Sequence, residues 1–147
     1  MIRRVAPAVL LLTLIAAGCG GARAGEIACQ QRLVELAGHD LLSVAGAEGL
    51  ERMSLEGCTE DQRSAARRTA RDARELALTF ARLRGPAAPS ESREQAIGAL
   101  QRQLEQEPGL QANRLFLEFQ SELEGYEMRR RIMREDLERM RRESGRR

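Results

Sequence analysis

The 147-residue chain contains no Trp, one His and one Tyr, only three Phe and three Cys, and no Lys among its 24 basic residues. One imidazole and three thiols are too few for most multi-ligand metal sites and most nucleophile–base pairs. Because aromatic residues form 3% of the chain and hydrophobic residues 42%, a core must be built from Leu, Ala, Met and Val. We therefore expect a single-domain, all-α, non-enzymatic protein without a cofactor or a metal.

The charges alternate in sign along the chain. Residues 25–58 carry two Arg and six acidic residues, a net charge of −4, and residues 86–127 carry three Arg and eight acidic residues, a net charge of −5. Residues 60–84 have a net charge of +3, and residues 128–147 have +5. Packing of oppositely charged helices explains this alternation better than nucleic-acid binding does, so we expect no nucleic-acid partner.

The start of the chain has the organisation of a secretory signal peptide. A positively charged beginning is followed by an uncharged stretch over 5–17, which is too short to span a bilayer. The sequence Ala-Ala-Gly-Cys at 16–19 then resembles the lipobox of bacterial lipoproteins, in which small residues precede a lipid-modified cysteine. This resemblance implies that the signal peptide 1–18 is removed, and that a lipid on Cys19 anchors the chain to the cell envelope, facing the periplasm.

A second cleavage site competes with the lipobox. The sequence Ala-Arg-Ala at 22–24 has the A-x-A form of an ordinary signal peptidase site, and cleavage there would release a soluble periplasmic protein beginning at Gly25. The position of Cys19 at the end of the apolar stretch favours the lipidated form, and Gly20 after it favours the outer membrane. In that form, the Gly- and Ala-rich residues 19–25 are expected to be a flexible tether.

Either cleavage leaves Cys29 and Cys58 in the mature chain. An even pair of cysteines in an oxidising compartment predicts a structural disulfide. The bond would close a loop of about 30 residues and stabilise the fold by roughly 3–4 kcal/mol.

The spacing of apolar residues predicts one helical domain over 26–143, a frayed tail at 144–147, and helices at about 26–45, 60–84, 92–106 and 110–143. Two of these helices begin with capping boxes, Thr59 with Gln62 and Ser92 with Gln95. We expect an antiparallel three- or four-helix bundle, built from helical hairpins, with an unusually long C-terminal helix.

His39 and Asp40 are adjacent in the first predicted helix. Neighbouring helical residues point about 100° apart, so we expect surface residues there rather than an acid–base pair.

The sequence Thr59-x-x-Gln62 after Cys58 resembles one copy of the Leu-Thr-x-x-Gln motif of Spy-type periplasmic chaperones, which are small helical proteins. The resemblance implies an alternative function, that of a soluble chaperone holding unfolded clients.

The last predicted helix repeats its apolar residues at two heptad positions, three residues apart. One series contains Phe116, Leu123 and Leu137, and the other contains Phe119, Tyr126, Met133 and Met140. Arg130 occupies a position of the first series. Either the apolar stripe is broken there, or the guanidinium reaches a carboxylate on a neighbouring helix.

The basic C-terminal part of this helix is rich in Met, whose flexible side chain adapts to varied apolar partners. It can serve as a core stripe, as a protein-docking surface, as a homodimer contact or as an amphipathic segment on lipid. We expect a lipid-anchored envelope protein that binds or escorts a protein partner here, through Tyr126, Arg130, Met133, Leu137 and Met140.

Overall fold

The computed structural model describes the backbone of residues 8–40, 42–88, 90–106 and 109–146, and the side chains of these residues except 8–19 and 110–112. This part of the chain forms five helices: α1 (Ala8–Gly38), α2 (Val44–Glu51), α3 (Glu60–Arg84), α4 (Arg93–Gln106) and α5 (Leu110–Ser144). The helices pack against one another, so the expected all-α class with a long C-terminal helix is confirmed.

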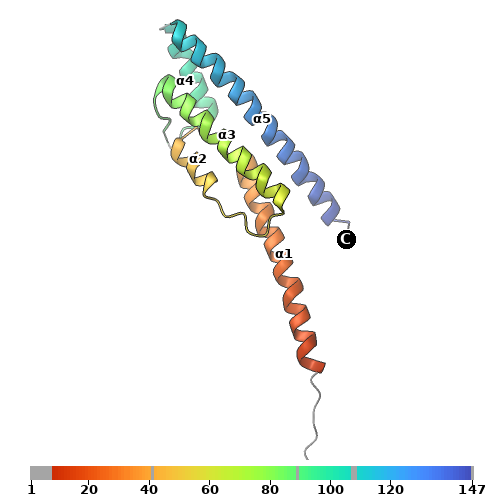
Figure 1. The fold of residues 1–147 in the computed structure, drawn as a ribbon. Coiled ribbons are helices and arrows are strands. Elements are labelled where there is room, and N and C mark those ends of the chain that lie inside the picture. Colours follow the sequence, from red (N-terminus) through yellow and green to blue (C-terminus); the bar gives the residue numbers. More distant parts are fainter. Residues whose placement is uncertain (1–7, 41, 89, 107–108, 147) are drawn as a thin grey trace, which may run out of the picture.

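The long helices α3 and α5 lie side by side and run in opposite directions (Figure 1). Near the start of α3, Gln62 contacts Met140 of α5, and near its end Phe80 contacts Phe119, with ring centroids 5.7 Å apart. Helix α1 packs against both, and its N-terminal part projects beyond the bundle (Figure 1). Helix α2 lies against α3, and α4 leads into α5.

Helix α3 has the bounds that its sequence predicts, because a capping box marks its start and a glycine marks its end. Thr59 Oγ1 accepts a hydrogen bond from the Gln62 backbone N–H at 3.3 Å, and Gln62 Oε1 accepts from the Thr59 N–H at 2.8 Å. At the other end, Gly85 has a φ of 98°, which favours glycine. The second expected capping box, Ser92 with Gln95, is also present at the start of α4.

The helix expected over 26–45 is divided into two. Helix α1 stops at Gly38, and Ser43 caps α2 by accepting a hydrogen bond from the Gly46 N–H at 3.1 Å. His39 and Asp40 therefore lie between the two helices and not on a helix. This corrects the prediction of one continuous helix over 26–45.

The segment 19–25, expected to be a flexible tether, continues α1. Its last residue is packed rather than loose. Gly57 has a φ of 81°, and a Cβ there would lie 2.3 Å from the Gly25 carbonyl oxygen, so only glycine fits at this close approach. At the opposite end of the chain, α5 stops at Ser144, one residue beyond the prediction.

The core contains the side chains of Leu36, Leu76, Phe80, Leu100 and Phe119, all at most 2% exposed. Alanines occupy much of the buried face of α3, and this allows its neighbours to approach closely. Within the described part of the chain, no helix is long and apolar enough to cross a membrane.

Candidate functional site

A groove with a volume of about 290 Å³ opens between the first half of α3 and the last third of α5. Leu33 of α1 forms its floor and is 3% exposed. We call this feature the docking groove, and its lining consists of Leu33, Asp61, Gln62, Ala65, Arg68, Thr69, Arg129, Ile132, Met133, Asp136, Leu137 and Met140.

The docking groove remains open because the α3 wall carries small side chains. Ala65 presents only a methyl group opposite Met133 and Leu137 of α5. Met133 is nearly buried, and Leu137 is half-buried. Ile132 stands at the rim with 51% of its surface exposed. The groove therefore presents a largely apolar surface to solvent.

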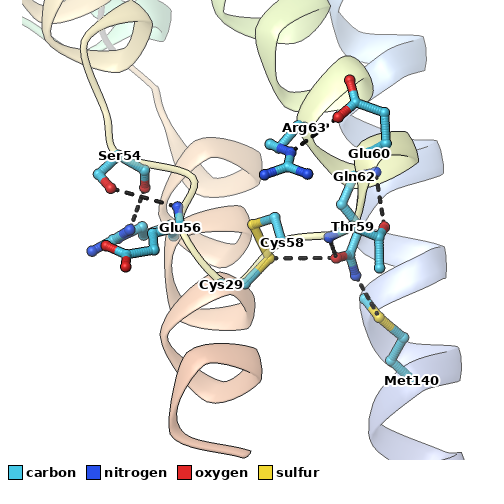
Figure 2. The surroundings of a disulfide bond; sticks show 10 residues. Cys29, Ser54, Glu56, Cys58, Thr59, Glu60, Gln62, Arg63 and Met140 are labelled. Atoms are coloured by element: carbon cyan, nitrogen blue, oxygen red, sulfur yellow. Dashed lines mark hydrogen bonds and ion pairs between the residues drawn. A yellow bond between two sulfur atoms is a disulfide. The ribbon is translucent and has the colours of Figure 1, made fainter. Parts of the chain in front are cut away.

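A disulfide joins α1 to the residue before the N-cap of α3, next to the groove-lining residue Gln62 (Figure 2). The sulfur atoms of Cys29 and Cys58 are 2.04 Å apart, which confirms the expected pair. Gln62 Oε1 lies 3.5 Å from Cys29 Sγ, and its Nε2 donates to Met140 Sδ at 3.4 Å. One capping residue thus contacts the disulfide and α5 as well as its own helix end.

Charged side chains on the walls of the docking groove are sorted by sign. Asp61 and Asp136 lie toward the start of α3, whereas Arg68 and Arg129 lie further along it. Arg129 forms an ion pair with Asp72. Asp136 is paired with Arg139. Arg129, Asp136 and Arg139 are about half exposed or more, and ion pairs at such positions are weak, so these groups can exchange partners at little cost.

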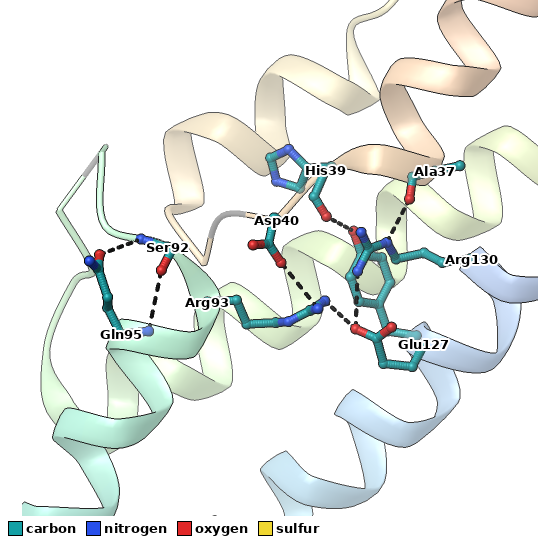
Figure 3. A network of polar contacts seen from close by, with 9 residues as sticks. Ala37, His39, Asp40, Ser92, Arg93, Gln95, Glu127 and Arg130 are labelled. Atoms are coloured by element: carbon teal, nitrogen blue, oxygen red, sulfur yellow. Dashed lines mark hydrogen bonds and ion pairs between the residues drawn. The ribbon is translucent and has the colours of Figure 1, made fainter. Parts of the chain in front are cut away.

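Above the groove, Arg130 is 4% exposed and lies where α1 ends (Figure 3). Its Nε donates to the carbonyl oxygen of Ala37 at 2.9 Å, and its Nη1 donates to Glu127 at 3.0 Å. The guanidinium carbon lies 5.4 Å from the centroid of the Tyr126 ring, a cation–π contact. The stripe on α5 is thus not broken. The acceptor on the neighbouring helix is a backbone carbonyl, and the carboxylate belongs to α5 itself.

Arg93 of α4 completes this cluster. It pairs with Asp40 at 3.1 Å and also with Glu127, while its backbone N–H donates to the Asp40 carbonyl at 2.8 Å. The Tyr126 hydroxyl donates to the His39 carbonyl at 3.4 Å. Burial raises the pKa of Tyr126 to about 12, although Arg130 opposes this shift. We call Ala37, His39, Asp40, Arg93, Tyr126, Glu127 and Arg130 the polar junction.

The structure divides the five predicted docking residues between these two places. Met133, Leu137 and Met140 come together in the docking groove. Tyr126 and Arg130 belong to the polar junction, where they are buried and hold helices together. The side chain of Cys19 lies outside the described residues.

Sequence reasoning missed the α3 wall of the docking groove, of which Ala65 is part. Ile132 belongs to the Met-rich C-terminal part of the last predicted helix, but it falls outside both heptad series and was not among the five predicted docking residues. Nothing in the sequence showed that Leu33 would line a groove together with two other helices.

No set of three or more His, Cys, Asp or Glu among the described residues could hold a metal ion. Asp40, adjacent to the single His, is engaged by Arg93. No protein-family model, no curated protein and no solved structure matches this chain. Function is therefore argued from the docking groove itself.

Proposed function

We propose that this chain is a non-catalytic binding protein of the bacterial cell envelope, and that it holds a helical segment of a protein partner in the docking groove. The observation that carries the proposal is the groove, which exposes apolar side chains of three helices. Two of its lining residues are Met, and flexible thioethers accommodate varied apolar side chains. Its volume of about 290 Å³ suits a few side chains of a partner rather than a large ligand.

The charges of the groove walls define the chemistry of the partner. A basic residue would be favoured beside Asp61 and Asp136, and an acidic residue beside Arg68 and Arg129. The segment that fits is an amphipathic helix with apolar residues at helical spacing between a cation at one end and an anion at the other.

A lipid on Cys19 would place this groove at the envelope. The lipobox-like residues 16–19 and the uncharged stretch before them support the anchor. The spacing along α1 adds a geometric argument, because Leu33 in the groove follows Cys19 by 14 residues, or about 21 Å of helix. A bound partner would therefore be held close to the membrane.

The binding proposal is tested with the full chain and three synthetic helical peptides that share one apolar face. One peptide carries Lys at one end and Glu at the other, the second carries Lys at both ends, and the third carries Glu at both. We expect the mixed peptide to bind most tightly by fluorescence anisotropy. In Arg68→Glu, the Lys/Lys peptide should become the preferred one.

Two matched variants of α3 locate the binding site. Ala65→Trp fills the docking groove and should raise the dissociation constant at least about tenfold. Ala81→Trp alters an equally half-buried alanine outside the groove and should leave binding unchanged. Equal affinity for all three peptides, or binding that survives Ala65→Trp, would remove the proposal.

The location is tested separately by intact mass spectrometry of membrane and soluble fractions from a Gram-negative host. A triacylated chain that begins at Cys19 and disappears in Cys19→Ser supports the anchor. A soluble chain that begins at Gly25 contradicts the anchor and favours the alternative, a free periplasmic chaperone. The Thr59 and Gln62 pair that resembles the chaperone motif forms the cap of α3, and Gln62 also lines the docking groove.

A further inference from the structure

The face of α5 that points away from the bundle is apolar at three positions. Leu117 is 65% exposed, Met128 52% and Ile132 51%, and these are three of the six large apolar side chains that are exposed in the described part of the chain. At 3.6 residues per turn, they fall in one stripe with Ser121 and Gly125. Figure 1 shows α5 along one edge of the bundle. We call this stripe the outer face of α5.

Gly125 supports a contact on this face. Glycine in the middle of a helix destabilises it relative to Ala, so its presence calls for a reason. Apart from its chain neighbours and the surrounding backbone of α5, no atom of the described residues lies within 4 Å of a Cβ built at Gly125. The close packing that would favour glycine is therefore not supplied by the chain itself.

We propose that the outer face of α5 is a homodimer surface, on which two copies pair in antiparallel orientation about an axis between residues 124 and 125. In this register, Leu117 lies opposite Ile132 of the second copy, and the small Ser121 lies opposite the large Met128. The two-fold symmetry repeats each contact, so the stripe is complementary to itself. Large side chains meet small or apolar ones at each of these levels.

Beside the axis, Glu124 of each copy lies opposite the small Gly125 of the other, and the charges further from the axis agree with the same register. Arg114 of one copy lies opposite Glu135 of the other, and this pair also occurs twice. Both side chains are exposed, and neither has an ion-pair partner among the residues whose side chains are described. The pairing thus uses charges that the fold leaves to solvent, and this complementarity selects a second copy as the partner.

The dimer is tested by sedimentation equilibrium of the full chain in one detergent-containing buffer. We expect a reversible dimer, which Leu117→Asp converts to monomer because it places two carboxylates against Ile132. Val34→Asp is the control, since Val34 is 46% exposed on α1, away from the outer face. A chain that is monomeric at about 1 mM, or a dimer that Leu117→Asp leaves intact, overturns the proposal.

Charge reversal tests the register. Arg114→Glu and Glu135→Arg should each raise the dissociation constant of their own homodimer roughly tenfold, because like charges then face each other. An equimolar mixture should form a heterodimer at least as tight as the original homodimer, since every pair in it is again opposite in sign. A mixture no tighter than the separate variants would overturn this register.

The outer face of α5 and the docking groove share Ile132 at the groove rim, whereas Leu117 belongs only to the outer face and Ala65 only to the groove. Variants of Leu117 and Ala65 therefore distinguish the two surfaces. Ala65→Trp should leave the dimer intact, and Leu117→Asp should leave peptide binding intact. If Leu117→Asp instead abolished peptide binding as well, the outer face would be part of the peptide site and not a homodimer surface.

Discussion

The docking groove and the polar junction lie on successive turns of the same helix, yet only one of them is closed. Arg130 in the junction and Met133 in the groove are three residues apart on α5, and both are nearly buried. At Arg130, side chains from α4 and α5 converge on the end of α1. At Met133, a groove of about 290 Å³ opens between α1, α3 and α5.

The difference has a physical cause in the backbone of α1. The last turn of a helix has carbonyl groups without intrahelical partners, and these require donors when they are buried. Arg130 and Tyr126 supply donors to the carbonyls of Ala37 and His39, which fixes the distance between α1 and α5. Around Leu33 the α1 backbone is satisfied within the helix, so the contacts of Leu33 with α5 are apolar. Such contacts tolerate a gap beside a residue as small as Ala65.

Removing the disulfide should have the largest effect on stability, and it should loosen α1 beside the groove rather than at the junction, because the bond holds α1 at the groove end. Replacing Cys29 and Cys58 by Ala should lower the free energy of unfolding by roughly 3.5 kcal/mol. Native-state hydrogen exchange should speed up in α1 below Leu33 and remain slow near Ala37, because Arg130 still binds that end. Loss of protection along the whole of α1 would show that the groove and the junction are one cooperative unit.

Local signals made much of the fold predictable. The capping boxes and the glycine after Arg84 lie within a few residues of the ends that they specify, so the bounds of α3 were predictable. The disulfide was predictable from the number of cysteines.

The division of the helix expected over 26–45 has a local signal in the Ser43 cap of α2, which the apolar spacing concealed. The contacts at the end of α1 were not predictable, because their donors on α5 lie 87 and 93 residues further along the chain. The role of Arg130 was not predictable for the same reason, because it depends on a contact with a distant part of the chain. Its heptad position predicted burial, but only the end of α1 explains what it binds there.

Removing the Arg130 guanidinium from the polar junction should have the second-largest effect on the free energy of unfolding. Arg130→Met keeps the length and the apolar stem of the side chain but leaves the buried Ala37 carbonyl without its partner. We expect a loss of about 3 kcal/mol in the free energy of unfolding by urea denaturation. Arg134→Met, at an exposed position on the same helix, is the control and should change stability by less than about 0.5 kcal/mol. Equal losses of unfolding free energy in the two variants would mean that the hydrogen bonds of Arg130 do not stabilise the junction more than an exposed arginine does.

Alkaline titration probes the polar junction without the docking groove, because the single Tyr of the chain lies in the junction and the chain has no Lys. Burial raises the pKa of Tyr126 from 10.0 to about 12, so between these pH values the unfolded chain has lost the phenolic proton and the folded chain retains it. The folded state then binds more protons, and its stability falls as pH rises through this window. The loss should reach about 2–3 kcal/mol, whereas stability is unaffected by this group below pH 10.

The chain has no second Tyr, so the tyrosinate absorbance reports Tyr126 alone. The measurement combines urea unfolding with the tyrosinate absorbance of the folded chain. In Tyr126→Phe the alkaline decline should vanish, while Met133→Leu in the groove should leave it unchanged. A tyrosinate band that appears near pH 10 in the folded protein would mean that water reaches the phenol. The junction would then be as open as the groove, and the contrast between a backbone-fixed contact and an apolar one would not hold.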